Sequence, residues 1–307
     1  KIEIKKYLNF LNMKEMEKMS LKKCEICGNK KTQLIRKKIS WNNNKYGILP
    51  VHCCSNCGFI FQNPRFNKNF YFKYYQGLYG QKVIMTKHSI LNTIKTQKQR
   101  GKLLLKFLDE YLPKKGSMLD VGCSMGYMMK PFLDRGWKCE GNDPFQSYVN
   151  YGRKHGLPVK CIQAEDMLIK KNSKDLIIIM GSLEHVYDAN MVMKKCEEAI
   201  KKNGILVLEA RGDPLGPIKK FFNQSHHRYF FGNTMELMMR KYGWEPFLTT
   251  KFPITGPSRP GTQFCFGRYK GSKVKKQYKG LIKNGKRETY LDIIYKLKYY
   301  DKISKNK

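Results

Sequence analysis

The chain has 307 residues, 41% of them hydrophobic, which is enough for one large domain and a small one. Its 60 Lys and Arg against 24 Asp and Glu give a net charge of +36, which would attract nucleic acid, anionic membranes or phosphorylated metabolites. The lysines are spread along the whole chain among asparagines, isoleucines and tyrosines, as AT-rich coding sequences produce. The charge alone therefore singles out no partner, and nucleic-acid binding is the less favoured interpretation.

Localisation is predicted from what the sequence does not contain. No apolar run approaches the roughly 20 residues of a membrane-spanning helix, and "KIEIKKYLNF" at the start is too charged for a secretory signal. The ten cysteines form two Cys-x-x-Cys pairs plus residues scattered through expected core elements, unlike a disulfide framework. We expect a cytoplasmic protein in a reducing compartment, without a membrane span.

After a charged lead (residues 1–20), residues 21–65 are predicted to form a zinc-binding module with short strands at 32–39 and 46–53. Two thiolates three positions apart can share one tetrahedral ion, and a following glycine permits the tight turn around it. Four thiolates leave no open coordination position, so a structural Zn²⁺ is expected, and Cys53 is interpreted as a bystander. The predicted ligands are Cys24, Cys27, Cys54 and Cys57.

Residues 66–115 are predicted to be an aromatic and helical connector, with a helix over 89–112 and two tyrosines, Tyr75 and Tyr79, that could close over a ligand. From 116 to 270 strand-like and helix-like segments alternate, which predicts an α/β fold with a parallel, doubly wound sheet. Residues 271–307 form a basic amphipathic tail. Packing of its helix on its own domain is favoured over binding to a membrane surface.

The stretch "LDVGCSMG" (119–126) is a strand followed by a glycine-containing turn. A dinucleotide fingerprint would be G-x-G-x-x-G, but here Ser124 lies between Gly122 and Gly126. The next strand ends in Asp143, where a carboxylate can accept hydrogen bonds from a ribose diol. The turn therefore predicts a ligand with a ribose, and the case for a phosphate is weak.

Five motifs in order, "LDVGCSMG", "EGNDPF", "CIQAED", "DLIIIMGSLEHVYD" and "KKNGILVLEA", resemble the class I S-adenosylmethionine-dependent methyltransferases over residues 116–270. "CEICG", "CSNCGFIFQNPRF" and "SLEHV" are similar to the subgroup with an N-terminal zinc-binding module, often associated with sugar C- or O-methylation in surface-glycan and natural-product pathways. The resemblance implies a Rossmann-like sheet with a small zinc-ribbon module and S-adenosylmethionine as cofactor.

The resemblance also implies roles for individual residues. The backbone of the glycine turn would pass close to the methionine portion of the cofactor, Asp120 would orient its amino group, and Asp143 would hold the ribose. Gln163 would lie at the adenine edge, where the family often has Asp. Capping of the adjacent helices is the alternative for both aspartates. The implied cofactor-binding set is Asp120, Gly122, Cys123, Ser124, Gly126, Asp143, Pro144, Gln163, Ala164, Glu165 and Gly181.

Methyl transfer also needs a base for the acceptor, and the candidates are His227, His185 and Glu184, with His226 as the alternative to His227. Glu184 and His185 could instead lock their turn through hydrogen bonds. Sugar C-methyltransferases carry a stretch that resembles Tyr-His-Glu-His before an aromatic run. Aligned on "YFFG", His227 matches the last histidine, but Gln224 and His226 replace the tyrosine and the glutamate.

The C-methylation apparatus is therefore incomplete. We expect O-methylation of a sugar, a nucleotide-linked sugar or another small hydroxyl compound. The alternatives are a sugar C-methyltransferase, an RNA methyltransferase or RNA-binding protein that uses its basic surface, and a non-catalytic scaffold. The intact cofactor residues argue against a scaffold.

Overall fold

The computed structural model describes residues 18–37, 49–78, 86–212, 222, 225–230, 233–259, 261–284 and 289–305. Two residues considered above, Tyr79 and Gln224, lie outside these ranges, as does most of the charged lead. Within the described ranges, no helix is both long enough and apolar enough to cross a bilayer.

The elements before the main domain are short, apart from one long helix. The first turn of this helix is capped by Thr86, whose side chain accepts a hydrogen bond from the Ser89 amide at 3.1 Å. The elements are β1 (Lys18–Met19), β2 (Thr32–Arg36), β3 (Val51–Cys54), β4 (Ile60–Gln62), β5 (Arg65–Phe66), α2 (Lys68–Lys73), η1 (Tyr74–Leu78) and α4 (Lys87–Leu108).

The main domain alternates strands and helices as predicted. Its elements are β6 (Ser117–Val121), η2 (Tyr127–Met129), α5 (Lys130–Asp134), β7 (Lys138–Asp143), α6 (Gln146–Lys154), β8 (Val159–Cys161), η3 (Ala164–Asp166), β9 (Lys174–Met180), α7 (Ala189–Ala199), β10 (Ile200–Arg211), β11 (Arg228–Tyr229), α9 (Thr234–Lys241), β12 (Trp244–Thr250), β13 (Thr262–Tyr269), α10 (Ser272–Asn284) and α11 (Tyr290–Lys305).

The central sheet has seven strands in the order β12-β13-β10-β9-β6-β7-β8, which confirms the expected Rossmann-like α/β fold. Strands β10, β9, β6, β7 and β8 are parallel neighbours. Strand β13 runs antiparallel to both β10 and β12, so it alone is reversed. The order changes direction at β6, and ligands in doubly wound sheets bind beyond the carboxyl ends of strands at such a switch point.

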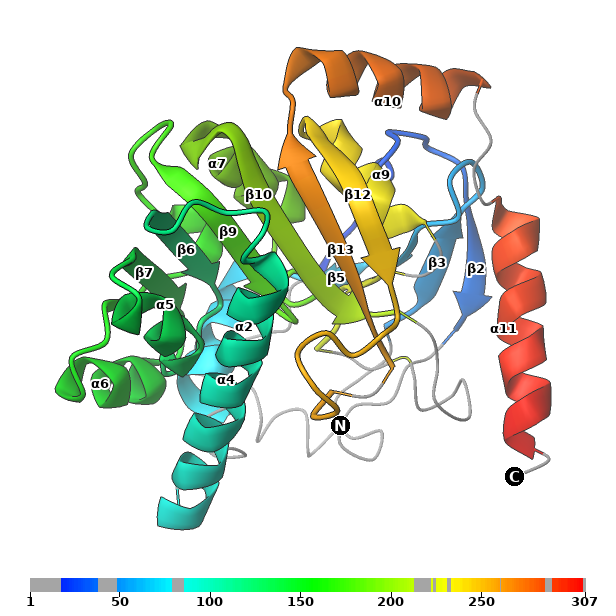
Figure 1. Ribbon diagram of the computed structural model, residues 1–307. Helices are drawn as coiled ribbons and strands as arrows, with labels where there is room; N and C mark the ends of the chain where they lie inside the picture. Colours follow the sequence, from blue (N-terminus) through cyan, green and yellow to red (C-terminus); the bar gives the residue numbers. More distant parts are fainter. Residues whose placement is uncertain are drawn as a thin grey trace.

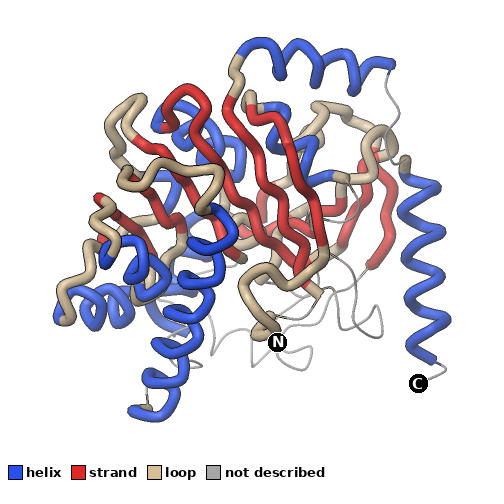
Figure 2. The backbone as a smooth tube through the Cα atoms, in the orientation of Figure 1, coloured by secondary structure: helices blue, strands red, loops and turns tan. Residues whose placement is uncertain are grey.

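Both faces of the sheet are covered, giving three layers (Figures 1 and 2). Successive residues of β6 point to opposite faces, so Met118 joins a core cluster with Leu104 and Phe132 of α4 and α5. Leu119 joins a second cluster with Val192 of α7 and Met238 of α9. Strands buried on both faces explain the continuous apolar run "LIIIM" in β9.

The N-terminal module is joined to the main domain through a shared sheet. Its four strands lie in the order β11-β4-β3-β2, and β11 comes from the chain after the main-sheet strand β10. Arg228 pairs with Phe61 and Tyr229 with Ile60 in antiparallel register. The range 116–270 thus supplies a strand to the range 21–65, a pairing that local sequence does not indicate.

The C-terminal helices pack on the rest of the protein. Helix α10 packs on α9, and the α11 residues Ile293 and Leu297 are buried in a cluster with Leu49 of the N-terminal module and Tyr229 of β11. The apolar side of α11 is therefore buried against its own chain, whereas its residues Tyr295 and Tyr299 are exposed.

A pair of helical glycines tests the packing of α4 against the sheet domain. A Cβ at Gly101 in α4 would lie 2.3 Å from the backbone oxygen of Met128, whereas a Cβ at Gly280 in α10 would meet nothing within 4 Å. Alanine is favoured over glycine inside a helix by about 1 kcal/mol. We expect Gly280→Ala to raise the free energy of unfolding and Gly101→Ala to lower it, as measured by denaturant titration. Equal stabilisation of both variants would contradict the close packing of α4 on η2.

Candidate active site

A cavity of about 620 Å³ lies at the carboxyl ends of β6, β7 and β9, at the switch point of the sheet. Tyr75 lines it, as do nine of the predicted cofactor and catalytic residues: Gly122, Ser124, Asp143, Pro144, Gln163, Ala164, Glu165, Gly181 and His185. They come from segments spread over more than 60 positions of the chain, and the parallel strands bring them to one edge of the sheet.

The glycine turn after β6 takes a backbone conformation that favours glycine. Gly122, Ser124 and Gly126 have φ angles of 77°, 54° and 86°. A Cβ at Gly122 would lie 2.4 Å from the Cβ of Ser182, whose hydroxyl donates to the Val121 carbonyl at 2.6 Å. The turn therefore passes close to the end of β9 and exposes backbone to the cavity.

Asp143 connects the ends of β6 and β7. Its Oδ2 accepts a hydrogen bond from the Ser124 amide at 2.8 Å, and its Oδ1 accepts one from the Phe145 amide at 2.9 Å. The hydrogen bonds from these two amides lower the pKa of Asp143, but burial outweighs them and raises it to about 6. Each oxygen keeps a further lone pair, so the carboxylate can accept additional hydrogen bonds from a diol in the cavity.

Three other predicted cofactor residues, Asp120, Cys123 and Gly126, are buried in or next to the turn and do not line the cavity. Asp120 and Cys123 are only 2% and 3% exposed, and a Cβ at Gly126 would lie 2.6 Å from Val159. Burial raises the pKa of Asp120 to about 7, opposed by the charge of Arg100 and reinforced by Asp143. These buried residues determine the shape of the turn.

One side of the cavity is a face of α4 that sequence reasoning missed. Its lining residues follow helical spacing: Asn92, Thr93, Thr96, Gln97 and Arg100. In the sequence they look like the solvated side of an amphipathic helix, because polar residues that face water and those that face a polar cavity form the same pattern. Only the position of α4 across the strand ends distinguishes the two cases.

Two arginines meet at a buried glutamate beside this face. Glu209, at the end of β10, forms ion pairs with Arg100 and with Arg259, the latter at 3.4 Å. Arg259 also donates to the Met180 carbonyl at 3.1 Å, and its guanidinium occupies the space that a side chain at Gly181 would need. Both arginines also line the cavity, so their guanidiniums place positively charged donors at this end of it, which suits an anionic group.

The turn after β9 brings His185 to the cavity in a defined state. Its Nδ1 lies 2.8 Å from the Ser225 carbonyl, which can only accept, so Nδ1 carries the proton and Nε2 of the neutral ring has a lone pair. Burial, with the nearby charges of Arg259 and Arg211 and against the hydrogen bond to Ser225, lowers the pKa of His185 to about 4. The ring is therefore neutral at physiological pH.

The other two predicted catalytic residues lie outside the cavity lining. His227 is fully buried against Tyr71, with ring centroids 3.8 Å apart, and its Nδ1 lies 3.0 Å from the Val186 carbonyl. Glu184 is 3% exposed, its Oε2 has no hydrogen-bond partner among the described residues, and burial raises its pKa. This placement does not favour direct contact of His227 or Glu184 with an acceptor. Both belong to the layer that supports the His185 turn.

Glu184, His185 and His226 also form a cluster whose potential ligand atoms lie within 4.8 Å of one another. The pKa of His226 is well below its ordinary value because of burial, followed by the charges of His185, Arg211 and Arg259. The arginine charges that oppose protonation of these histidines also oppose a divalent cation. The cluster is better suited to remain neutral than to hold a metal.

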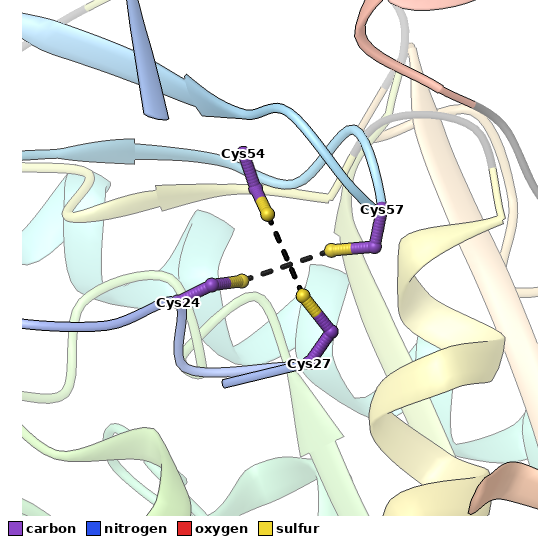
Figure 3. A group of neighbouring side chains, drawn as sticks. All are labelled: Cys24, Cys27, Cys54 and Cys57. Atoms are coloured by element: carbon purple, nitrogen blue, oxygen red, sulfur yellow. Dashed lines mark hydrogen bonds between the residues drawn. The ribbon is translucent and has the colours of Figure 1, made fainter. Parts of the chain in front are cut away.

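The four predicted zinc ligands do converge (Figure 3). Sulfur atoms of Cys24 and Cys57 lie 3.7 Å apart, and those of Cys27 and Cys54 lie 3.5 Å apart. A tetrahedral zinc with Zn–S bonds of about 2.3 Å requires sulfur separations of about 3.8 Å, whereas a disulfide requires about 2.05 Å. All ten cysteines of the chain are free of disulfides, so the cluster fits a metal ion.

The knuckle glycines behave as predicted, since Gly28 and Gly58 have φ angles of 75° and 68°. Their amides donate to the Cys24 and Cys54 carbonyls at 3.0 and 3.1 Å. Cys53 is buried in a different core cluster, which places it outside the metal-binding set.

A sequence profile of the family described as "Methyltransferase domain" matches residues 95–248, which include the glycine turn, strands β6 to β11 and the cavity-lining residues Thr96, Gln97 and Arg100 of α4. The chain belongs to this methyltransferase family. The expected methyltransferase domain on a Rossmann-like sheet and the expected cluster of four cysteines are thereby confirmed.

Curated relatives of this methyltransferase match it over part of their length. A ubiquinone biosynthesis O-methyltransferase of Bradyrhizobium diazoefficiens is 28% identical over 97 residues, 30% of this chain and 38% of the relative. A second, of Rickettsia prowazekii, is 27% identical over 136 residues, 42% of this chain and 48% of the relative. The matched part thus spans less than half of the length of each relative.

Solved structures are similar to the methyltransferase at low identity. An S-adenosylmethionine-dependent methyltransferase of Archaeoglobus fulgidus shares 15% identity with a TM-score of 0.46, covering 54% of this chain and 92% of that one. One of Mesorhizobium loti shares 17% identity with a TM-score of 0.44, covering 54% and 97%.

Proposed function

We propose that the protein transfers a methyl group from S-adenosylmethionine to a hydroxyl oxygen of a small polar acceptor, with a sugar or nucleotide-linked sugar as the preferred class. The observation that carries the proposal is the cavity, in which Asp143 and the neutral Nε2 of His185 line the same space. The names of the curated relatives, which are O-methyltransferases, are consistent with oxygen as the acceptor atom.

The cofactor residues divide into contacts and supports. In this proposal Asp143 accepts the ribose hydroxyls, Pro144, Gln163, Ala164 and Glu165 surround the adenine, and the backbone at Gly122, Ser124 and Gly181 borders the methionine portion. Arg100 and Arg259, which line the cavity, carry the positive charges that would attract the methionine carboxylate. The shape of the turn depends on the buried residues Asp120, Cys123 and Gly126.

When bound, the cofactor supplies an electrophilic methyl group for an in-line displacement. His185 accepts the hydroxyl proton at Nε2 while the Ser225 carbonyl holds its Nδ1 proton in place. An attacking oxygen becomes more acidic as its bond to carbon forms, so a neutral imidazole of low pKa is a sufficient base if it is close. His227 is assigned a supporting role, because its buried ring holds the Val186 carbonyl.

The lining of the cavity favours a small acceptor over nucleic acid. None of the described lining residues is lysine, although lysine makes up most of the chain's positive charge. The α4 face instead offers the amides and hydroxyls of Asn92, Thr93, Thr96 and Gln97, groups that pair with neutral hydroxyls. A labelled-cofactor screen of nucleotide-linked sugars, phenols and short RNAs tests this choice. Labelling of RNA alone would contradict the proposal.

We also propose that the four-cysteine cluster holds one structural Zn²⁺. The sulfur separations suit a tetrahedral ion and the four thiolates leave no position for a substrate. The ion would stabilise the N-terminal module by linking its two knuckles.

Removal of the Asp143 carboxylate tests the cofactor site. Asp143→Ala should weaken binding of S-adenosylmethionine by about 1 to 3 kcal/mol, the scale for hydrogen bonds to a charged group. Isothermal titration calorimetry measures the change. Asp134→Ala, which removes an exposed carboxylate of α5, is the control and should bind normally. Unchanged affinity in Asp143→Ala would remove this residue from the site.

The base is tested by variants of two histidines. His185→Ala should lower turnover about 100-fold to 10,000-fold, with cofactor affinity nearly unchanged, because a base contacts the acceptor. His227→Gln should lower it much less. Since the pKa of His185 is about 4, its ring gains a proton only near that pH, and turnover at saturating cofactor should show no histidine-like loss between pH 8 and 5. A larger loss in His227→Gln than in His185→Ala would reverse the assignment.

Adjacent cysteines provide a matched test of the metal site. Cys54→Ser should lower the zinc content from one ion per chain and destabilise the N-terminal module, because metal binding and folding are coupled in so small a unit. Cys53→Ser should retain zinc, since Cys53 lies outside the cluster. Elemental analysis of the purified variants decides, and equal zinc content in both would rule out Cys54 as a ligand.

A further inference from the structure

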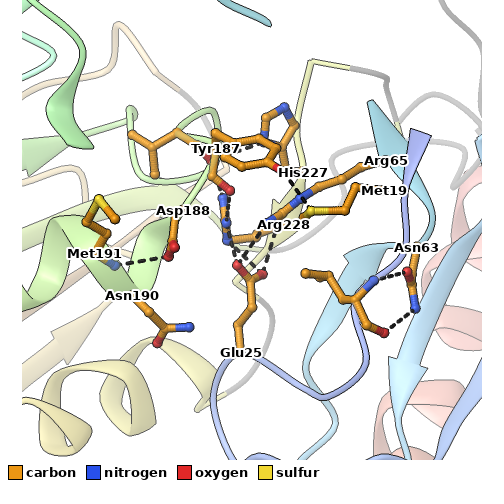
Figure 4. Close-up of polar contacts among 12 residues, drawn as sticks. Met19, Glu25, Asn63, Arg65, Tyr187, Asp188, Asn190, Met191, His227 and Arg228 are labelled. Atoms are coloured by element: carbon orange, nitrogen blue, oxygen red, sulfur yellow. Dashed lines mark hydrogen bonds and ion pairs between the residues drawn. The ribbon is translucent and has the colours of Figure 1, made fainter. Parts of the chain in front are cut away.

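We propose that Glu25, between two cysteines of the first knuckle, is a positioning residue for the catalytic turn and acts through Arg228. The inference rests on the proposed function in one respect, that the 182–187 turn carries the base. The physical link is a chain of buried polar contacts from the knuckle to the carbonyls of this turn (Figure 4).

The first contact is a buried ion pair between parts of the chain 203 positions apart. Arg228 donates from Nε to Glu25 Oε2 at 2.9 Å and from Nη2 to Oε1 at 2.5 Å. Arg65 donates to the same carboxylate at 3.3 and 3.5 Å. Glu25, Arg65 and Arg228 are 6%, 2% and 0% exposed. A glutamate in a zinc knuckle has no need of such burial for metal binding, so the carboxylate serves the arginines.

The second contact is between Arg228 and the turn. Its Nη1 donates to the Val186 carbonyl and lies 3.5 Å from the Leu183 carbonyl, and its Nη2 donates to the Tyr187 carbonyl at 2.9 Å. A planar guanidinium holds its donors in a rigid fork, so fixing one side by Glu25 also fixes the direction of the other. Figure 4 shows Arg228 between Glu25 and the backbone near Tyr187.

The neighbouring residue adds to the same connection. The His227 amide donates to the Glu184 carbonyl at 2.8 Å, and its Nδ1 lies 3.0 Å from the Val186 carbonyl. Gln62 of β4 holds this segment from the other side, through its amide to the His227 carbonyl at 2.9 Å and its Nε2 to the His226 carbonyl at 2.7 Å. The turn is thus held by a strand that belongs to the sheet of the N-terminal module.

The geometry separates two halves of the cavity. His185, Val186 and Tyr187 line the acceptor side and depend on this connection. Asp143 and the glycine turn are held by bonds within the main sheet. Loss of the Glu25 charge would remove the carboxylate that both buried guanidiniums contact, which loosens the turn and leaves the ribose side intact.

Hydrogen exchange followed by mass spectrometry tests the proposal on the full chain. Glu25→Gln keeps the size of the side chain and removes its charge. Amides of residues 182–188 should exchange at least about tenfold faster, the scale of a lost charge-assisted hydrogen bond, while those of 120–126 and 141–146 stay unchanged. Zinc content should remain that of the wild type, and S-adenosylmethionine affinity should change less than about twofold.

Tyr278→Phe is the matched control. It removes a hydroxyl that donates to the Ile26 carbonyl of the same knuckle at 2.5 Å and leaves the Glu25 carboxylate untouched. In Tyr278→Phe the amides of residues 182–188 should exchange at the wild-type rate. Glu25→Asp, which restores the charge with shorter reach, should recover part of the protection. If Glu25→Gln fails to fold, Arg228→Lys, which keeps the charge and loses the fork, should show the same local loosening.

The outcomes separate this inference from the proposed function. Unchanged exchange of 182–188 in Glu25→Gln, or equal loosening in Tyr278→Phe, would overturn the role of Glu25, whatever the enzyme methylates. Failure of the wild-type chain to bind S-adenosylmethionine would overturn the proposed function and leave the exchange experiment valid. With an acceptor in hand, Glu25→Gln should lower kcat about tenfold or more without a matching loss of cofactor binding.

Discussion

The guanidinium of Arg228 is the group on which the arrangement of the site depends. A fully buried positive charge must be neutralised, and its donors must all find acceptors, or the fold loses stability. Glu25 supplies the charge and the carbonyls of the 183–187 turn supply the remaining acceptors. Meeting both demands at once requires the first knuckle, strand β11 and the turn after β9 to lie together. The N-terminal module is consequently part of the site's framework.

A similar balance of charge governs the opposite wall of the cavity. Glu209 is fully buried and pairs with both Arg100 and Arg259, which come from α4 and from the segment between β12 and β13. These two elements border the cavity on one side. Each places an arginine at the strand ends, where an acid such as Glu209 compensates the charge. Because both guanidiniums line the cavity, the wall offers charged donors that a purely neutral lining would lack.

The contrast between the whole chain and its cavity bears on the acceptor. The net charge of +36 is carried largely by lysines, yet the described lining residues use arginine, amides and hydroxyls instead. A strongly hydrated ammonium is a poor partner for a desolvated pocket, whereas a guanidinium can pair with a buried carboxylate through two hydrogen bonds. The bulk charge of the protein and the chemistry of its site are therefore separate properties.

The sequence by itself determined those parts of the protein that depend on short-range rules. Spacing within Cys-x-x-Cys-Gly, the glycine turn after an apolar strand and the acid at the end of the next strand each act within a few residues, and each is where it was predicted. The alternation of strands and helices likewise predicted the sheet, apart from the reversed β13.

Contacts between distant segments were decided only by the tertiary structure. The polar face of α4 became a cavity wall because the helix crosses the strand ends, and β11 joined the sheet of the N-terminal module. His227 matches a family motif by alignment, but its ring is buried against Tyr71, while His185 reaches the cavity. Nothing in the local sequence distinguishes these two histidines, since the difference between them lies in which carbonyls and rings the folded chain places around each.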